Sequence, residues 1–301
     1  MAKVELSVVI ASHDAATVIE ACLAALEPQR ADGVEVILAD SSGDGTCDLA
    51  RRRFPWVHVL HFDQPLAIPT LRGRGLAAST GQVIAFLDPF SIAAGDWARQ
   101  VLAAHRLHQN LVIGGDVDLH RAESRPWTDW VIYLNEYALF MPPVARGETW
   151  ILPGSNISYK RDALFDGTRP RYQDFWKTFV NREIAQSGSR LWLEPAIRVS
   201  LNKPIPFMDY LRTRFDHGRC FAGMRVKEAS PVVRACRAAS TPLVPVLLTW
   251  RWSRGFWSKR RHRVRFMTTI PLQLVLFGVW ACGEACGYVR GAGRTCEQLF
   301  Y

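Results

Sequence analysis

The sequence predicts an α/β fold in which helices flank a mostly parallel sheet, followed by a C-terminal helical region. Strand-like apolar runs alternate with helix-like segments up to residue 88, and polar residues gather where those runs end. Apolar residues make up 49% of the 301 residues and charged residues 22%, which is typical of a globular chain and excludes a disordered one. We expect one domain over residues 1–203 and amphipathic and apolar helices over residues 204–301.

The first 88 residues contain four predicted strands separated by three predicted helices. β-branched, apolar runs predict strands at Val4–His13, Val34–Asp40, Val57–Phe62 and Val83–Asp88. Apolar residues at helical spacing predict helices within Asp14–Gln29, Cys47–Pro55 and Pro69–Gln82. Alternation of this kind implies parallel strands joined by right-handed crossovers.

The middle of the chain is less regular. Asn110–His120 reads as a strand, which we expect to pair antiparallel, and Ser124–Pro143 reads as an aromatic-rich helix. Glu148–Leu164 is a loop or strand that leads into a helix. Asp174–Leu201 contains a helix, a turn at Ser187 and Gly188, and a strand.

Positive charge concentrates near the C-terminal end of a chain whose formal net charge is +9. Arg251–Arg265 is basic with interleaved tryptophans, a pattern that suits either nucleic acid or anionic lipid. The apolar segment Phe266–Val289 that follows favours a membrane over nucleic acid, because it is long enough to cross or enter a bilayer. A half-embedded helix and a buried core helix are the alternatives. The shorter run Ser240–Trp250, with two prolines, suits a re-entrant or interfacial segment.

The cysteines and the first residues bear on the compartment. Seven cysteines occur as scattered singletons, so we expect reduced thiols rather than disulfides or zinc ligands. The first thirteen residues lack the pattern of a signal peptide. Lys and Arg beside the apolar segments predict the cytoplasmic side of a membrane.

Polar clusters follow three of the predicted parallel strands. They are Ser12-His13-Asp14, Asp40-Ser41-Ser42 and Asp88. Ligands of open α/β sheets bind at the carboxyl ends of the strands, so these clusters are the candidate binding site.

Five pieces of sequence occur in the order LSVVIASHD, VEVILADSSGDGT, GLAASTGQVIAFLD, AGDW and LPGSNISYKRDAL, and the tail contains RFDHGRCFAGMR before its apolar segments. In this order the five pieces resemble the family 2 glycosyltransferases of the GT-A fold, and the tail resembles a membrane-associated bacterial branch of that family. The resemblance covers roughly residues 5 to 200 and implies a GT-A domain that uses a nucleotide-sugar donor.

The resemblance also implies donor-binding residues. Asp40 would accept a hydrogen bond from the nucleotide base, and Ser12 and Asp14 would lie beside the base and ribose. Arg72 or Arg74 would offer a fork of donors to phosphate. A helix cap for Asp40 and a solvated surface charge for Arg72 are the structural alternatives.

In the family the fourth strand ends in Asp-x-Asp, whose carboxylates hold Mg²⁺ or Mn²⁺ on the diphosphate. Here Asp88 fills the first position and Phe90 the second, so Asp88 would bind the ion as a single carboxylate. His217 or Arg219 are alternative cations for neutralising the diphosphate.

Inverting members use a general base, usually the Asp of a Glu-Asp pair that opens a helix. Trp176 and Lys177 occupy those positions here, and Asp174 is the nearest carboxylate, with a helix N-cap as its alternative role. Asn156 matches the acceptor-side loop but is also typical of a structural turn. The aromatics of Trp127–Phe140 line either a sugar or lipid wall, or a core.

The sequence therefore predicts an inverting glycosyltransferase at the cytoplasmic face of the cell inner membrane, with a lipid or lipid-linked acceptor. The alternative is a catalytically inactive relative that binds membrane and partner proteins. Phe90 and the missing Glu-Asp pair motivate that alternative.

Overall fold

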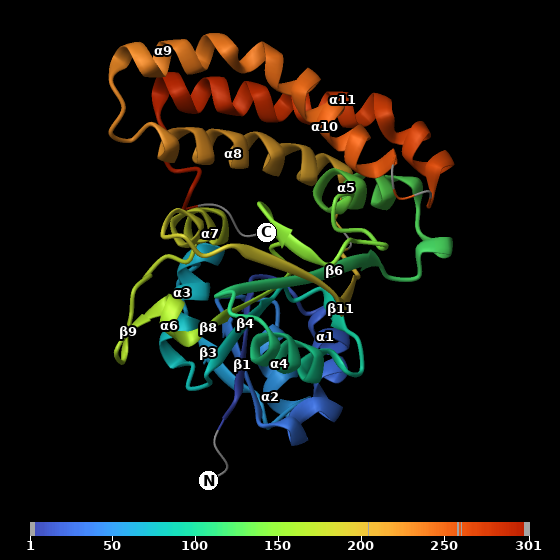
Figure 1. Ribbon diagram of the computed structural model, residues 1–301, viewed down its shortest axis with the longest axis vertical. Coiled ribbons are helices and arrows are strands. Elements are labelled where there is room, and N and C mark those ends of the chain that lie inside the picture. The colour runs from blue at the N-terminus through green and yellow to red at the C-terminus, as the bar shows by residue number, and fades with distance from the viewer. Residues whose placement is uncertain (1–3, 204, 258, 260, 298–301) are drawn as a thin grey trace. The chain divides into compact units, whose positions relative to one another are not determined.

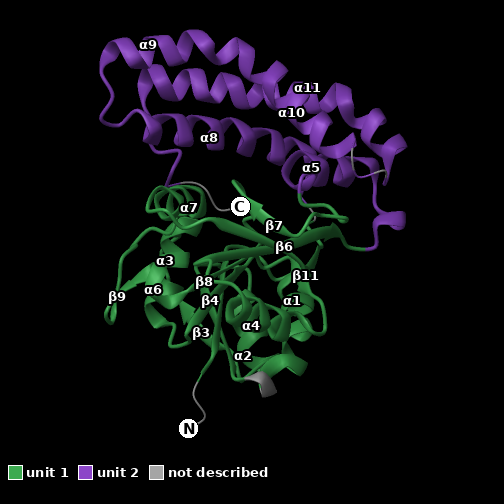
Figure 2. Ribbon diagram, in the orientation of Figure 1, with its two compact units in different colours: residues 1–120, 140–203, 300 green, residues 121–139, 204–299, 301 purple. Residues whose placement is uncertain are grey.

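A computed structural model describes residues 4–203, 205–257, 259 and 261–297 (Figure 1). The chain forms two compact units (Figure 2). Unit 1 contains residues 1–120 and 140–203, and unit 2 contains residues 121–139 and 204–299. The aromatic helix after residue 124 therefore belongs with the C-terminal helices.

Unit 1 is built on a nine-stranded sheet with the order β3-β2-β1-β4-β8-β6-β11-β5, in which β7 pairs with β11 outside this path. The strands are β1 (Leu6–Ser12), β2 (Val34–Asp40), β3 (His58–His61), β4 (Val83–Leu87), β5 (Ser91–Ala93), β6 (Val112–Leu119), β7 (Gly147–Thr149), β8 (Asn156–Lys160) and β11 (Leu191–Leu201). A separate hairpin joins β9 (Phe165–Asp166) to β10 (Arg169–Pro170).

The N-terminal half of the sheet is parallel, as the sequence predicts. β1 pairs in parallel with β2 and β4, and β2 pairs in parallel with β3. The middle of the sheet is mixed, because β8 lies between β4 and β6 and runs antiparallel to both. The predicted antiparallel pairing of the strand after Asn110 is thus found with β8, while β11 joins its other edge in parallel.

The helices of unit 1 are α1 (Ile19–Leu26), η1 (Glu27–Asp32), α2 (Thr46–Arg53), α3 (Ile68–Ala78), α4 (Trp97–Leu107), α6 (Arg161–Leu164) and α7 (Lys177–Gln186). All seven residues of β1 are buried, because both faces of the sheet are covered. Glycine allows α3 to lie against β1: a Cβ at Gly75 would come within 2.4 Å of Val9 Cγ1. On the opposite face, α4 contacts β8 through Trp97 and Asn156.

One apolar core joins β1, β4, β8, α3 and α7. Its centre is a group of rings in which Phe86 stacks on Phe175 with centroids 4.3 Å apart, and Tyr159 meets both edge-on. Phe86 is the last residue but one of β4, and Phe175 comes two residues before α7 begins. The core therefore fixes the start of α7 relative to the end of β4, which matters for the site described below.

Unit 2 consists of α5 (Trp127–Tyr137), α8 (Phe207–Arg225), α9 (Pro231–Ser240), η3 (Thr241–Leu243), α10 (Val244–Trp257) and α11 (Arg263–Arg290), preceded by the short η2 (Ala122–Ser124). Glycines bring α8 and α11 into backbone contact. A Cβ at Gly218 would lie 2.4 Å from the Trp280 carbonyl oxygen, and one at Gly283 would lie 2.2 Å from that of Phe215. Small residues at such contacts are typical of closely packed helices, including membrane helices.

Several expectations for this region are resolved within unit 2. The α5 aromatics Trp130, Tyr133 and Tyr137 are buried, which supports the core alternative. Glu284 interrupts the apolar run of α11, yet its carboxylate accepts a hydrogen bond from Arg225 at 2.5 Å inside the helix pair. Glu284 can therefore be buried on the apolar helix α11, because Arg225 neutralises its charge.

The expectation of reduced, unpaired cysteines is wrong for two of the seven. Cys220 on α8 and Cys296 after α11 form a disulfide. The chain beyond α11 turns back along α8, where Arg219 donates to the Gly291 carbonyl oxygen, and this return brings together cysteines separated by 76 positions. Sequence spacing alone carries no signal for such a pairing.

Among the described residues of unit 2, two helical segments are by length and composition able to cross a membrane: Pro231–Trp257 and Arg263–Arg290. The run Ser240–Trp250 is thus the centre of a 27-residue helical stretch rather than a separate short segment. In the first segment 6% of the most apolar window is buried, compared with 39% in the second. Large apolar side chains such as Val246, Leu247 and Trp250 are exposed as a result.

Candidate active site

The candidate site lies at one edge of the sheet, where β1, β2 and β4 end. Ser12 and Asp40 are the last residues of β1 and β2 and are direct partners in the parallel register. Asp88 comes directly after β4, which pairs with β1 on its other side. The three polar clusters predicted from the sequence therefore meet at the carboxyl ends of adjacent strands.

Asp40 is fully buried and is held by donors from two loops. Ser12 Oγ donates to Asp40 Oδ2, Ser42 Oγ donates to the same oxygen at 2.6 Å, and the Ser42 amide donates to Oδ1 at 2.9 Å. Ser42 Oγ also lies 2.7 Å from the amide nitrogen of Asp14, which adopts a left-handed conformation with φ of 50°. The structure thus brings Ser12, Asp14 and Asp40 together. The helix-cap alternative for Asp40 is wrong, because α2 begins after Gly45 without a side-chain cap.

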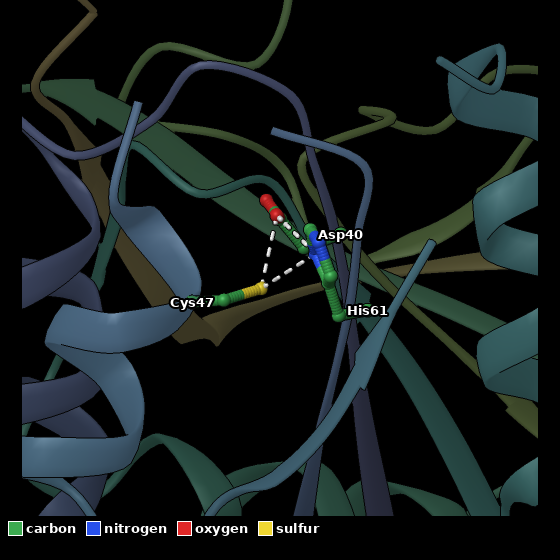
Figure 3. Close-up of side chains that lie close together, drawn as sticks. All are labelled: Asp40, Cys47 and His61. Carbon is green, nitrogen blue, oxygen red and sulfur yellow. Dashed lines mark hydrogen bonds and ion pairs between the residues drawn. The ribbon is translucent and has the colours of Figure 1, made fainter. Parts of the chain in front are cut away.

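Cys47 and His61 complete the surroundings of Asp40 (Figure 3). Cys47 Sγ donates to Asp40 Oδ1 at 3.1 Å and lies 3.3 Å from His61 Nδ1, and the His61 and Asp40 atoms are 3.8 Å apart. Asp, Cys and His are also the residue types that bind zinc. Burial, followed by the hydrogen bond to Asp40, raises the pKa of Cys47 to about 12. In the structure the three side chains form a hydrogen-bonded network around Asp40.

Asp88 is paired with two cations. Arg72 Nη2 lies 3.1 Å from Asp88 Oδ1, and Lys177 Nζ lies 3.5 Å from the same oxygen. All three side chains are largely buried, with exposed fractions of 13% for Asp88, 17% for Arg72 and 7% for Lys177. Lys177 Nζ also donates to the Gly154 carbonyl oxygen. The surface-charge alternative for Arg72 is therefore wrong.

The pKa values of this group reflect its burial and its charges. Burial alone would raise the pKa of Asp88, but Lys177, Arg72 and Lys203 outweigh it and hold that pKa below its usual range. Burial, with Arg72 as the next cause, lowers the pKa of Lys177 to about 7, against the opposing effect of Asp88. A buried lysine is tolerated here because a carboxylate and a carbonyl oxygen face it.

These residues do not fit the divalent ion that the family pattern implies. Phe90 offers no ligand at the second carboxylate position, and its ring lies 5.1 Å from Lys203 Nζ. At about 4 Å and an effective dielectric constant of about 20, a divalent ion would repel each of the two neighbouring cations by roughly 8 kcal/mol, and this repulsion offsets the attraction of the single Asp88 carboxylate. Asp88 is thus neutralised by protein cations, and the binding of Mg²⁺ or Mn²⁺ there remains a prediction that the local charges oppose.

Asp174 lies in the loop before α7 and is exposed. Its Oδ1 accepts a hydrogen bond from Thr70 Oγ1 on α3 at 2.7 Å. The N-cap residue of α7 is Trp176, which makes no side-chain cap bond, so the helix-cap alternative for Asp174 is wrong. Its role as general base remains a prediction.

Asn156 opens β8 and is 1% exposed. Its side-chain nitrogen donates to the carbonyl oxygens of Asp116 at 2.8 Å and Ile197 at 2.9 Å, and its oxygen accepts from Trp97 Nε1 at 2.9 Å. The two amide hydrogens are therefore used by the protein. This arrangement supports the structural alternative over contact with an acceptor hydroxyl.

The remaining predicted residues lie elsewhere. Arg74 is exposed on α3, one position beyond the close contact of that helix with Gln173. His217 and Arg219 lie on α8 in unit 2, where Arg219 donates to Gly291, so their contribution to the donor site remains a prediction. A separate pocket of about 440 Å³ lies at the opposite end of β4, beside Val83.

Sequence reasoning missed Lys177, which the resemblance marked only as a residue unable to act as the base. The signal for Lys177 was its position. The resemblance aligns it with the Asp of the Glu-Asp pair, so a positive charge stands where the family has a negative one. The structure shows that this position faces Asp88.

Comparison with known proteins agrees with this geometry. The family model "Glycosyl transferase family 2" matches residues 7–167, more than half of the chain. EpsH of Bacillus subtilis (strain 168), provisionally described as a glycosyltransferase, is 29% identical over 114 residues. That match covers 36% of this chain and 32% of EpsH, so the chain matches about a third of the length of this curated relative.

Two solved structures share the fold. The mannosyltransferase PcManGT from Pyrobaculum calidifontis, in complex with GDP-Man and Mn²⁺, has a TM-score of 0.52 at 18% identity, covering 91% of this chain and 86% of that one. TarS 1-349 from S. aureus, in complex with UDP-GlcNAc, has a TM-score of 0.55 at 13% identity, covering 95% of this chain and 92% of that one. The predicted family and fold are therefore confirmed: the chain belongs to glycosyl transferase family 2 and has the GT-A fold.

Proposed function

We propose that this protein is an inverting glycosyltransferase that moves a sugar from a nucleotide-sugar donor to a lipid or lipid-linked acceptor. One observation carries the proposal: Ser12, Asp40 and Asp88 meet at the carboxyl ends of three adjacent strands within the family 2 match. In this proposal the nucleotide base lies toward Asp40 and the diphosphate toward Asp88, because ligands of open α/β sheets bind at the carboxyl ends of the strands. PcManGT and TarS were solved with nucleotide sugars, which supports this class of donor.

The reaction proposed is a single displacement at the anomeric carbon of the donor sugar. The acceptor hydroxyl oxygen forms a bond to that carbon on the face opposite the diphosphate, and the hydroxyl proton passes to a base. The bond between the anomeric carbon and the diphosphate oxygen breaks, and its electron pair leaves with the nucleoside diphosphate. Asp174 is the proposed base, because its carboxylate is exposed in the loop before α7 and only the Thr70 hydroxyl is described as its donor.

The acceptor is proposed from the apolar surface of unit 2. Exposed Val246, Leu247 and Trp250 on α10 suit lipid better than water, and Arg251 and Arg254 follow them in the same helix. We propose that this region lies in or on the cell inner membrane with its basic residues on the cytoplasmic side.

Donor titration tests the proposal. UDP-GlcNAc and GDP-mannose are titrated calorimetrically into the detergent-solubilised full chain and into an Asp40→Asn variant. We expect the wild type to bind at least one of them, and Asp40→Asn to bind it about tenfold more weakly, since a charged acceptor is lost. Asp63→Asn is the matched control, because Asp63 is exposed and, among the contacts described, pairs only with Nε2 of His61, the ring nitrogen that faces away from Asp40. Equal binding by wild type and Asp40→Asn would contradict the proposal that Asp40 binds the nucleotide base.

A second candidate, a catalytically inactive relative that binds membrane and partner proteins, is favoured by Phe90 and Lys177 at the metal and base positions. The two candidates differ in turnover. Release of the nucleoside diphosphate from a bound donor, in the presence of a membrane lipid extract and abolished by Asp174→Asn, excludes the inactive candidate. Donor binding without any release of diphosphate supports it.

A further inference from the structure

We infer that Arg72 and Lys177 form a built-in diphosphate-binding site that takes the place of the divalent ion used by relatives. The inference rests on the proposed function, since it concerns the donor's diphosphate. It predicts that binding of the diphosphate needs no metal.

The first support is the position of Lys177. Its ammonium belongs to the first residue of α7 and reaches Asp88, which directly follows β4. Arg72 reaches the same carboxylate oxygen from the second turn of α3. Two helices thus each direct a buried cation at the point where the family places the ion.

The second support is the rigid mounting of both cations. Thr70 and Asp174 join α3 to the loop before α7, and the Phe175 amide donates to the Pro69 carbonyl oxygen at 2.8 Å. A Cβ at Gly73 would lie 1.7 Å from the Gln173 carbonyl oxygen, so only glycine permits this contact. Because loop and helix are tied together, Arg72 and Lys177 keep a fixed separation without a ligand.

The third support is the balance of charge. Asp88 carries one negative charge, whereas Arg72 and Lys177 both pair with it and Lys203 also acts on it. With Lys177 in its protonated form, the group carries more positive than negative charge in a largely buried place. A diphosphate supplies the missing negative charge, while a metal ion would add to the excess.

The fourth support is the capacity for further hydrogen bonds. Within the described part of the chain, the Lys177 ammonium uses two of its three hydrogens, on Asp88 and Gly154. Arg72 uses one of its five N–H groups, on Asp88. Both side chains can therefore bind phosphate oxygens without giving up Asp88, which acts as a positioning residue for them.

The consequence for the reaction concerns the leaving group. As the bond between the anomeric carbon and the diphosphate oxygen breaks, its electron pair passes to that oxygen. In this proposal negative charge therefore grows beside Lys177 and Arg72. Fixed cations stabilise such charge without reorganising during the step. No ion has to enter with the donor or leave with the product.

The test measures binding of three probes, UDP, GDP and inorganic pyrophosphate, to the detergent-solubilised full chain. Each titration is made in EDTA and again with Mn²⁺. We expect wild-type affinities in EDTA to lie within about threefold of those with Mn²⁺. Lys177→Met should weaken binding in EDTA at least tenfold, equivalent to about 1.4 kcal/mol.

Two further variants separate charge from folding. Lys177→Arg keeps the positive charge and should bind within a few-fold of wild type. Arg182→Met removes an exposed cation from the same helix and should bind like wild type. Thermal unfolding of each variant is recorded by circular dichroism, and if Lys177→Met fails to fold, Arg72→Gln takes its place with the same expected loss.

The outcomes are distinct. Binding that disappears in EDTA and returns with Mn²⁺, or that is unchanged in Lys177→Met, overturns the inference but leaves the glycosyltransferase proposal standing. Metal-free, Lys177-dependent binding of pyrophosphate without binding of either nucleotide supports the inference and counts against the proposed function. If no probe binds under either condition, both are wrong.

Discussion

Replacing Asn156 by alanine should destabilise unit 1 strongly, because three buried polar groups would lose their partner. The Asp116 and Ile197 carbonyl oxygens would lose their donor, and Trp97 Nε1 would lose its acceptor. Each unsatisfied buried group costs about 1–3 kcal/mol, and water entering the vacated space recovers part of that. We therefore expect the free energy of unfolding to fall by about 3–4 kcal/mol.

The assay is thermal unfolding followed by intrinsic tryptophan fluorescence. For a unit of this size each kcal/mol lowers the melting temperature by about 2–4 °C, so a decrease of roughly 10 °C is expected. Asn110→Ala is the matched control, since half-buried Asn110 donates, among the described contacts, only to the Arg190 carbonyl oxygen, in a bond open to solvent. The control should change the melting temperature by no more than about 2 °C.

The result that would refute this reasoning is an Asn156→Ala protein that melts like wild type. If such a protein also bound donor normally but transferred sugar poorly, Asn156 would be an acceptor-binding residue after all. Loss of stability together with loss of activity is the expected pattern for a structural role.

Two further predictions concern pH and helix packing. Burial, with Lys160 and His108 as lesser causes, lowers the pKa of His105 from 6.5 to about 3. Between these values the unfolded chain binds a proton that the native chain refuses, so stability falls as pH drops below 6.5, by up to about 1.4 kcal/mol per pH unit. Melting temperatures between pH 7 and 4 should fall less steeply in His105→Gln, and identical slopes would contradict the assignment. In unit 2, Gly283→Val should lower the melting temperature, because the added Cβ would collide with the Phe215 carbonyl oxygen. Gly278→Val is the control and should leave the melting temperature unchanged, because a Cβ there would have nothing within 4 Å. Equal effects of the two substitutions would argue against the contact at Gly283.

The N-terminal half of the fold could be predicted from sequence because its signals are local. Each strand there is a continuous apolar run followed by a polar turn, so Ser12, Asp40 and Asp88 could be assigned to strand ends. Parallel strands place their carboxyl ends at one edge of a sheet, and this rule is enough to bring the three residues together.

The second half of the site depends on contacts between distant parts of the chain. Lys177 reaches Asp88 because the loop before α7 is tied to α3, and no periodicity encodes that attachment. Asn156 looked like a turn residue of an acceptor loop, but it opens a strand that inserts into the middle of the sheet. The Cys220–Cys296 disulfide likewise depends on how the chain returns after its last helix.

The insertion of β8 between β4 and β6 has a consequence for synthesis on the ribosome. When Leu87 emerges, the outer side of β4 has no neighbour, and its partner strand is made roughly 70 residues later. Until then the nascent chain presents a bare apolar edge that other chains can join. Expression of a fragment that stops near residue 110 should for this reason yield insoluble protein, whereas one that continues through β11 carries its own cover.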